Sequence, residues 1–455
     1  MPYGSQKVAI VGGGLAGLAA GCALADAGYK VRLFERRPYL GGRASSYQHP
    51  GTGEVVDNCQ HVLLGCCTNL IDLYRRSGVE DKVHWFTRLN FLTPGGENSI
   101  IEIGGLPAPL HTAPTFLKSK ALNINDKVGI AKAMLQLRGE LKDDDGTSFL
   151  DWLRKHKQTE RAISRFWAPV LVSALNEDLD KCSSRYAGQV FRESFLKSAE
   201  AGKMGIPAIP LSDLYSAAGE YIRQRGGEVN LRASVEGFKA DAEGVRICVG
   251  GEELRADFAV LAAPFNVIGN LLPDDDASRP LREMAAQFES SPITGVHLWF
   301  DRQITDLEHA VLLDRTIQWM FHKSKLLNRG GDASYVELVV SASNALVEMG
   351  RQEIIDLAVR ELAEFFPIVR EAKLTKATVI KEIHATYSPK PGVDAYRPKA
   401  KSAWPRVFLA GDWTDTGWPA TMEGAVRSGY LAAEALAGKK FMVPDLPARG
   451  LMRFL

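Results

Sequence analysis

Three short stretches of this 455-residue chain combine residue types and spacing that suit chemistry, and the first is a glycine-rich turn near the amino terminus. Gly12, Gly14 and Gly17 follow the apolar run 8–11, and Glu35 lies 18 residues beyond the last glycine. A first glycine permits a sharp turn, a second lets a pyrophosphate approach the backbone, and a third lets the following helix pack closely. The free N–H groups of that helix attract phosphates, and the acid accepts hydrogen bonds from a ribose. The pattern predicts dinucleotide binding; the alternative is a glycine-rich turn in an ordinary α/β sheet.

The same stretch ends in a glycine pair followed by an arginine, Gly41-Gly42-Arg43. A guanidinium can bind two oxygens at once, and glycines let a loop follow the surface of a ligand closely. We therefore expect Gly42 and Arg43 to contact the nucleotide, together with Arg36 in the loop before them. The alternative is a surface turn that carries a solvated arginine.

A second cluster, formed by Asp57, Asn58, Gln60 and His61, interrupts apolar sequence and precedes a helical pattern over 68–77. His61 is the only member that can exchange protons near neutral pH without a large shift of its pKa. We predict that it is a proton donor or relay, oriented by Gln60 or Asn58. A lone histidine is more often structural, and that interpretation stays open.

The third stretch lies near the carboxyl terminus, where the strand-like run 406–410 is followed by Gly411 and Asp412. A helix is predicted to begin near Met422 and to continue to Ala437. The positive end of such a helix stabilises negative charge in front of it, which suits a reduced cofactor.

Strands and helices alternate along the chain and must bring these stretches together. The beginning reads as a strand, a helix over 18–27 and a second strand, and 227–235 and 256–264 are each predicted as one further strand. We predict an α/β fold with a Rossmann-like dinucleotide-binding domain and an interleaved α+β substrate domain. The expected boundaries are 1–85, 210–280 and 395–440 for a discontinuous dinucleotide-binding domain, 86–209 and 281–394 for the substrate domain, and 441–455 for a carboxy-terminal tail.

Composition argues against several classes of function. The formal net charge of +1 gives no electrostatic basis for binding nucleic acid. Residues 1–6 lack the basic and apolar regions of a signal peptide, and no run of about 18 apolar residues is present to span a membrane. The six cysteines include no CxxC pair, so we expect reduced thiols and no metal site. A cytoplasmic enzyme is the expectation.

The two amino-terminal motifs resemble those of the flavin amine oxidase and phytoene desaturase superfamily, whose members are GR2-type flavoproteins that bind FAD. The resemblance implies that Glu35 binds the adenosine ribose, that Arg43 lies beside the flavin or pyrophosphate, and that Val235 contacts the adenine through its backbone. It also implies that Asp412 hydrogen-bonds the ribityl or phosphate part of FAD, and that the turn 422–425 abuts the isoalloxazine ring. The residues expected to bind FAD are Gly12, Gly14, Leu15, Ala16, Gly17, Glu35, Arg36, Gly42, Arg43, Val235, Gly411, Asp412, Met422 and Ala425.

The segments 57–65, 411–413 and 419–425 more specifically resemble the bacterial hydroxysqualene dehydroxylases, and the resemblance covers nearly the whole chain. That family usually has glycine in place of Cys59, so the loop would differ here if the glycine needs a positive φ. The resemblance implies reductive removal of the allylic hydroxyl of hydroxysqualene, giving squalene for squalene and hopanoid biosynthesis. His61 is the expected proton donor, and reduced flavin would supply hydride to the resulting cation. Because only one GxGxxG fingerprint is present, an external electron donor is expected.

Three other functions remain open. A carotenoid-type desaturase would use the flavin in the oxidising direction on a related polyene. A flavin amine oxidase would lack the cysteinyl-flavin link of the monoamine oxidases, since no cysteine follows Cys248. A non-catalytic prenyl-binding escort protein would have lost flavin binding, whereas Glu35, Arg43 and Asp412 are all present.

Two stretches mix basic and apolar residues in a way that suits peripheral contact with a membrane. They are the tail 441–455 and the segment 116–122. Because a polyprenyl substrate has almost no solubility in water, contact with the inner face of the cell membrane would fit such a substrate.

Overall fold

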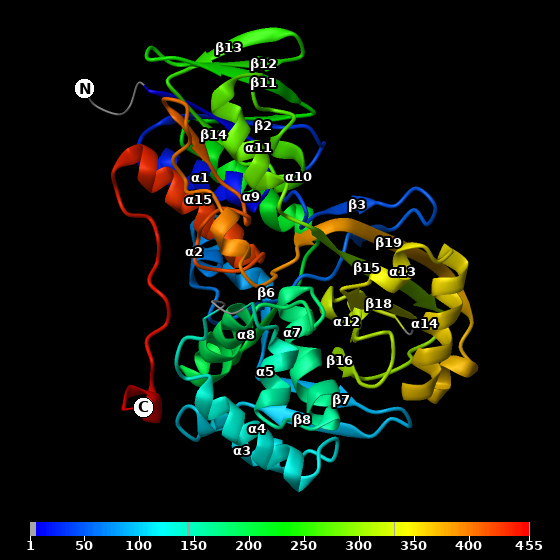
Figure 1. The fold of residues 1–455 in the computed structure, drawn as a ribbon. Helices are drawn as coiled ribbons and strands as arrows, with labels where there is room; N and C mark the ends of the chain where they lie inside the picture. Colours follow the sequence, from blue (N-terminus) through cyan, green and yellow to red (C-terminus); the bar gives the residue numbers. More distant parts are fainter. Residues whose placement is uncertain (1–5, 143–145, 332, 455) are drawn as a thin grey trace.

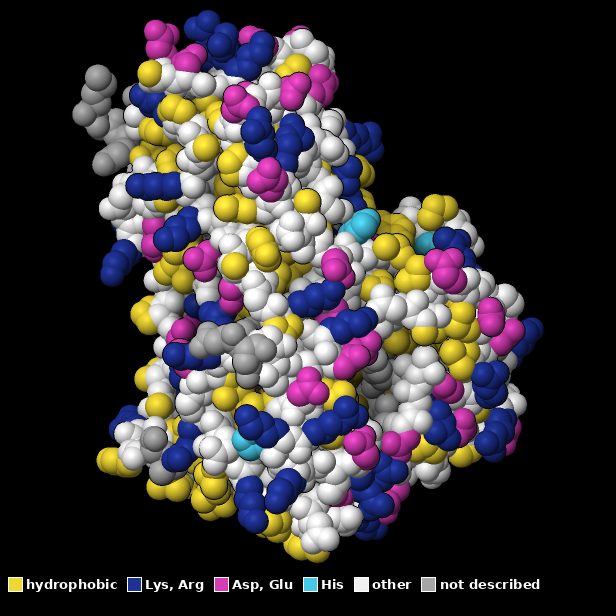
Figure 2. All heavy atoms as spheres, viewed as in Figure 1, with side chains coloured by type: hydrophobic (Ala, Val, Ile, Leu, Met, Phe, Trp, Pro, Cys, Tyr) yellow, Lys and Arg dark blue, Asp and Glu magenta, His cyan; other side chains and the backbone are white. Residues whose placement is uncertain are grey.

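The computed structural model describes residues 6–142, 146–331 and 333–454, and two β-sheets organise them (Figure 1). Residues 1–5, on which the signal-peptide expectation largely rests, lie outside the described residues. Among the described residues, no helix has both the length and the apolar character needed to cross a bilayer. Figure 2 shows side chains of both charge signs spread over the face in view.

The first sheet has five parallel strands and matches the predicted dinucleotide-binding fold. Its order is β10 (Glu228–Leu231), β2 (Lys30–Glu35), β1 (Lys7–Val11), β14 (Phe258–Leu261) and β20 (Val407–Leu409). Helices α1 (Leu15–Asp26), α9 (Leu211–Gln224) and α15 (Met422–Ala437) cover one face, and the antiparallel strands β11 (Val235–Ala240), β12 (Val245–Val249) and β13 (Glu252–Ala256) cover the other. Alternation along β1 explains both layers, because Val8 and Ile10 pack with the helices while Ala9 and Val11 pack with the small sheet.

Helices from opposite ends of the chain pack tightly beside this sheet. A Cβ atom on Gly429 of α15 would lie 2.2 Å from the carbonyl oxygen of Ala16 in α1. A Cβ atom on Gly17 would lie 1.9 Å from the carbonyl oxygen of Gly12. Glycine at both positions lets α1 approach the glycine turn and α15 at backbone distance.

The second sheet has seven strands and lies beside the first (Figure 1). Its order is β19 (Leu374–Tyr387), β15 (Ser290–Phe300), β18 (Ser334–Ser341), β17 (Trp319–Phe321), β16 (His309–Leu312), β7 (Arg88–Leu92) and β8 (Asn98–Glu102). Helix α14 (Arg351–Phe365) packs on the face that carries Val296 and Leu298. Residues of the opposite parity, Gly295 and His297, therefore face the chain segment near Asn58, and a Cβ on Gly295 would lie 3.5 Å from the Asn58 carbonyl oxygen.

A helical part fills the lower region in Figure 1 and encloses an aromatic core. Its helices are α3 (Ala113–Lys118), α4 (Ile124–Gln136), α5 (Phe149–Lys155), α6 (Glu160–Ala162), α7 (Ala168–Leu175) and α8 (Ser184–Phe191). Two π-helical turns, Ile163–Trp167 and Arg192–Leu196, interrupt it. Phe166 stacks on Phe191 at 6.0 Å, and Trp167 contacts Phe191 edge-on at 4.8 Å. Such π turns are often found at functional sites.

The remaining elements are short and connect these units. They are β3 (Ser46–Gln48), β4 (Val55–Asp57), β5 (Leu63–Leu64), α2 (Thr68–Arg76), β6 (Val83–Phe86), β9 (Met204–Pro207), α10 (Phe265–Ile268), α11 (Arg279–Ala285), α12 (Lys323–Leu326) and α13 (Asn344–Val347).

Two predicted strands are wrong in extent. The single strand expected over 227–235 is broken, because Arg232 adopts a φ of +56° and the chain leaves β10 to start β11 in another sheet. The strand expected over 256–264 is likewise divided, with β13 ending at Ala256 and β14 ending at Leu261. The predicted α/β fold is confirmed; the domain boundaries stay a prediction.

Candidate active site

The glycine turn leaves the first turn of α1 open to a ligand. Gly12 has a φ of +110°, and Gly14 caps α1 without any side-chain hydrogen bond. The Gly41 N–H donates to the Gly13 carbonyl at 2.9 Å, which brings the two glycine segments together. Leu15 and Ala16 form the buried start of the helix. This is the arrangement that binds phosphate groups at helix amino termini.

Glu35 lies directly behind this turn and is held by backbone groups. Its Oε2 accepts the Gly13 N–H and its Oε1 accepts the Arg37 N–H, both at 2.8 Å. The Ala233 N–H donates to the Glu35 carbonyl at 2.9 Å, so the chain reaches Val235 close to this carboxylate. The acid is thereby fixed at the edge of the sheet, where a ribose would be bound.

Arginines flank the second glycine segment. Arg36, a predicted ligand, is exposed, whereas the Nη1 of Arg37 donates to the Gly42 carbonyl at 3.0 Å. The Nη2 of Arg43 lies 2.5 Å from Oδ1 of the buried Asp412, and its Nη1 donates to the Ala385 carbonyl at 3.0 Å. The amino- and carboxy-terminal motifs therefore meet at one point, and the roles of these residues toward a cofactor stay a prediction.

The carboxy-terminal motif is anchored to α15. Gly411 has a φ of +144°, and its N–H donates to the Ser428 hydroxyl at 2.8 Å. Thr421 caps the helix by accepting the Gly424 N–H at 3.0 Å. The Met422 sulfur accepts a hydrogen bond from the Tyr215 hydroxyl at 3.3 Å, and Ala425 lies in the first turn of the helix.

We call the glycine turn 12–17, Glu35, the segment 41–43 and Asp412 the FAD cradle. The loop 57–61 is hydrogen-bonded directly to it. The Asn58 amide donates to the Arg43 carbonyl at 2.7 Å and accepts the Ser45 N–H at 3.2 Å. Cys59 is buried and is not among the described residues with a positive φ, so this position accommodates a side chain without backbone strain.

His61 is oriented by the backbone rather than by the neighbours that the sequence suggested. Its Nδ1 lies 2.8 Å from the Cys59 carbonyl oxygen, an arrangement in which Nδ1 carries the hydrogen. Burial lowers the pKa of His61, so the imidazole is neutral at pH 7. The Gln60 amide instead donates to the His61 carbonyl at 3.0 Å, and Asn58 binds the cradle. No described residue hydrogen-bonds Nε2 of His61, so the neutral imidazole can accept a proton there and pass it on.

A buried cluster of charged groups lies behind this loop. Nζ of Lys323 lies 2.7 Å from Oδ2 of Asp57, 2.7 Å from Oε1 of Gln60 and 3.6 Å from Oε2 of Glu337. Lys323 is 1% exposed and Glu337 is 0% exposed. One ammonium therefore faces two carboxylates in the protein interior.

The two carboxylates of this cluster differ in protonation. Burial raises the pKa of Asp57, but the Lys323 ammonium and the hydrogen bonds from Lys323, Ser46 and Leu211 bring it below its usual value. Burial raises the pKa of Glu337 to about 8, and the charge of Lys323 offsets this only in part. Neither Glu337 oxygen has a hydrogen-bond partner among the described residues. At neutral pH, Asp57 and Lys323 form the ion pair and Glu337 is a neutral acid.

His297 lies opposite Glu337 in the β15–β18 pairing. Its Nδ1 contacts the Tyr335 hydroxyl at 2.8 Å, and its Nε2 has no hydrogen-bond partner within the described chain. Burial lowers the pKa of His297 to about 3, so this imidazole is neutral as well.

A family model decides the class of protein. The model of flavin-containing amine oxidoreductases matches residues 15–437, which is most of the chain. The chain belongs to the flavin-containing amine oxidoreductase family. FAD is the cofactor of this oxidoreductase, and the described residues fit it: an uncapped helix start, a fixed acid at the end of β2, and the Arg43–Asp412 pair.

Relatives of this flavin oxidoreductase include carotenoid desaturases. The chain is 28% identical over 469 residues to the 15-cis-phytoene desaturase of Synechococcus elongatus, covering 96% of each protein. It is also 28% identical to the probable zeta-carotene desaturase of that organism, covering 95% of this chain and 98% of the relative. The structure of putrescine oxidase bound to putrescine superposes with a TM-score of 0.73 at 18% identity, covering 96% of this chain and 99% of the other. That likeness shows the fold alone.

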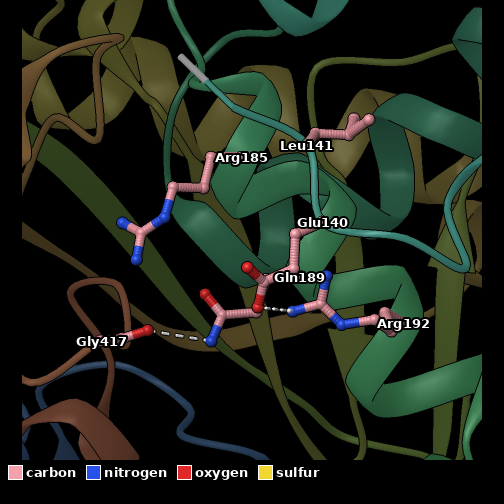
Figure 3. Close-up of a pocket in the computed structure, with 6 residues that line it drawn as sticks. All are labelled: Glu140, Leu141, Arg185, Gln189, Arg192 and Gly417. Carbon is pink, nitrogen blue, oxygen red and sulfur yellow. Dashed lines mark hydrogen bonds and ion pairs between the residues drawn. The ribbon is translucent and has the colours of Figure 1, made fainter. Parts of the chain in front are cut away.

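A small cavity between the helical part and the carboxy-terminal motif is not the substrate site (Figure 3). Its volume is about 60 Å³, far below the several hundred Å³ of typical ligand pockets. Its polar side chains bond to one another or to its walls: Gln189 donates to the Gly417 carbonyl at 3.0 Å, and Arg192 pairs with Glu140 at 3.7 Å. None of the predicted site residues lines it.

Sequence reasoning missed Arg37, Lys323, Glu337 and His297. Glu337 could have been recognised as a candidate, because it is the one acid in the otherwise apolar or hydroxyl-bearing strand Ser334–Ser341. A carboxylate inside such a strand indicates a buried polar site. The sequence gives no indication that Lys323 is buried, because its neighbours His322, Ser324 and Lys325 suggest a solvated turn.

Proposed function

We propose that this flavin oxidoreductase removes the allylic hydroxyl of hydroxysqualene to give squalene. The polyprenyl class of substrate is supported by the relatives whose names specify phytoene and zeta-carotene. The reaction is supported by one observation above all: Glu337 is a neutral acid buried behind the loop that carries Gln60 and His61. Loss of a hydroxyl as water needs such a proton, because hydroxide is a poor leaving group.

In this proposal the chain supplies the proton and excludes water. Glu337 holds the reserve proton. His61 receives that proton at Nε2 and passes it to the substrate hydroxyl, and Glu337 is left as a carboxylate beside the Lys323 ammonium. The C–O bond then breaks, water leaves, and an allylic cation remains. FAD, when bound in its reduced form, supplies the hydride that completes the product. An apolar environment prevents water from capturing the cation.

The decisive experiment is anaerobic incubation of the dithionite-reduced protein with hydroxysqualene, followed by product analysis. We expect squalene to form. A protein that keeps its FAD yet forms no squalene would contradict the proposal. The role of His61 is tested separately with His61→Ala, for which wild-type turnover with FAD still bound would contradict the assignment.

The second candidate is a desaturase that acts on a related polyene in the oxidising direction. It is favoured by the two carotenoid desaturases, which resemble the chain over nearly its whole length. Incubation of the oxidised protein with phytoene or squalene separates the candidates, because only a desaturase introduces new double bonds. In that reaction the buried cluster would accept a proton instead of donating one.

A further inference from the structure

Helix α4 has two apolar faces, and only one of them is covered by protein. Its inward residues include Ile130 and Ala133, which belong to a hydrophobic core. On the outward side, Ile124, Val128 and Leu135 are exposed, Ile124 to 67%. Ala131 is also exposed, so apolar residues recur at intervals of four, three and four. This spacing places them in one stripe along the helix.

The carboxy-terminal turn lies next to the segment 107–108, which precedes α3 and α4 in the chain. The Leu451 N–H donates to the Ala108 carbonyl at 2.9 Å, and Gly450 packs against the backbone of Ala108. Phe454 is 87% exposed. Figure 2 shows hydrophobic side chains gathered along this lower edge of the molecule, with Lys and Arg beside them. We call the exposed side chains of residues 106–135 and 449–454 the α4 face.

The α4 face concentrates the apolar surface of the molecule. Among the described residues, thirteen large hydrophobic side chains are exposed, and eight of them belong to this face. They are Leu106, Leu110, Leu117, Ile124, Val128, Leu135, Leu451 and Phe454. Exposed apolar side chains that gather in one part of a molecule indicate a binding site more strongly than single scattered ones do.

Charge indicates which partner covers this face. Residues 106–135 contain four lysines, and their only acid is Asp126. Asp126 is buried, and its carboxylate accepts the Asn123 N–H at 2.9 Å at the start of α4. Lys120 pairs with Glu97 at 3.1 Å, and the turn adds Arg449 and Arg453. Protein interfaces are depleted in lysine, whereas an apolar stripe flanked by lysines suits an anionic lipid surface.

We propose that the α4 face rests on an anionic phospholipid bilayer, with α4 in the plane of the interface. The apolar stripe enters the acyl boundary, and the lysines contact lipid phosphates. The face adjoins the aromatic core, since Phe116 contacts Phe166 edge-on at 5.6 Å. This docking does not depend on the reaction that the enzyme performs.

The test is flotation of the purified, FAD-loaded chain with vesicles of phosphatidylcholine and phosphatidylglycerol in equal parts, and with vesicles of phosphatidylcholine alone. The apolar variant is Ile124→Gln/Val128→Gln/Leu135→Gln, which keeps residues that favour a helix. The charge variant is Lys127→Gln/Lys132→Gln. The matched control is Ile383→Gln, an isoleucine 41% exposed on β19. Retained flavin absorbance and circular dichroism show that each variant is folded.

We expect the wild type and the control to float with the anionic vesicles. The partition coefficient of the apolar variant should fall roughly tenfold or more, because three exposed apolar side chains can no longer transfer into lipid. The charge variant should lose the preference for phosphatidylglycerol and its dependence on salt. A wild type that stays unbound, or an apolar variant that binds normally, would overturn the proposal. So would a wild-type dimer that ignores vesicles and dissociates in the apolar variant, since a second copy would then cover the face.

Discussion

Glu337 offers the sharpest physical test of the site, because its protonation can be measured without any substrate. The side chain is fully buried, its oxygens have no hydrogen-bond partner among the described residues, and Lys323 is already neutralised by Asp57. The perturbation is Glu337→Gln, which keeps the size of a neutral glutamic acid and cannot ionise.

The magnitude follows from the pKa of Glu337, which burial raises from 4.5 to about 8. Below pH 4.5 the folded and unfolded chains both hold this proton. Between these two values the unfolded chain has lost the proton and the folded chain keeps it, so the stability contributed by this group falls as pH rises. At about 1.4 kcal/mol per pH unit, the whole interval corresponds to about 5 kcal/mol. Above pH 8 the contribution is lost.

The assay is chemical denaturation of the wild type and the Glu337→Gln variant across this pH range. We expect the free energy of unfolding of the wild type to decrease relative to that of the variant, by about 1.4 kcal/mol for each pH unit. An infrared band of a protonated carboxylic acid should be present in the wild type and absent in the variant. A pH-independent difference would refute the reasoning, because it would mean that Glu337 is ionised in the fold.

Three further predictions concern the FAD cradle. Glu35→Ala leaves two backbone N–H groups without an acceptor, and we expect the Kd for FAD in fluorescence titrations to rise roughly 10- to 100-fold; an unchanged Kd would contradict the role of this acid. Gly17→Ala should abolish flavin absorbance in the purified protein, because the new Cβ would meet the Gly12 carbonyl. The control is Gly28→Ala, at a position with a φ of +89° and no atom near the new Cβ. It should keep FAD and lower the free energy of unfolding by about 1–2 kcal/mol. Asp412→Asn removes the negative partner of Arg43 and should raise the flavin reduction potential, measured by redox titration. An unchanged potential would place the Arg43–Asp412 pair away from the flavin.

The local parts of the fold could be predicted from the sequence. The turn from Gly12 to Gly17 and the following helix depend on residues close together in the chain, and the structure has them where expected. The residues at which the later strands end could not be predicted in this way. Arg232, with a φ of +56°, lies where the chain leaves β10 for another sheet, and nothing in the type of residue signals this conformation.

The candidate site, too, could be predicted only in the part that is local in sequence. The polar cluster of Asp57, Gln60 and His61 is visible in the sequence, but its chemistry is determined by Lys323 of α12 and Glu337 of β18. Their approach depends on which face of β18 and of α12 turns inward. That choice is made by tertiary packing across more than 250 residues of chain.

The contact between Arg43 and Asp412 also constrains how the protein is made. The two residues are 369 positions apart, and β20 and α15, which complete the first sheet, are synthesised long after β1 and α1. While the chain is being synthesised, β14 has no partner on one side, and α1 has no α15 to pack against. Such unfinished sheets expose apolar surface and strand edges. The Arg43–Asp412 side of the FAD site therefore forms only after β20 and α15 have been synthesised, so the amino-terminal motif alone offers FAD an incomplete site.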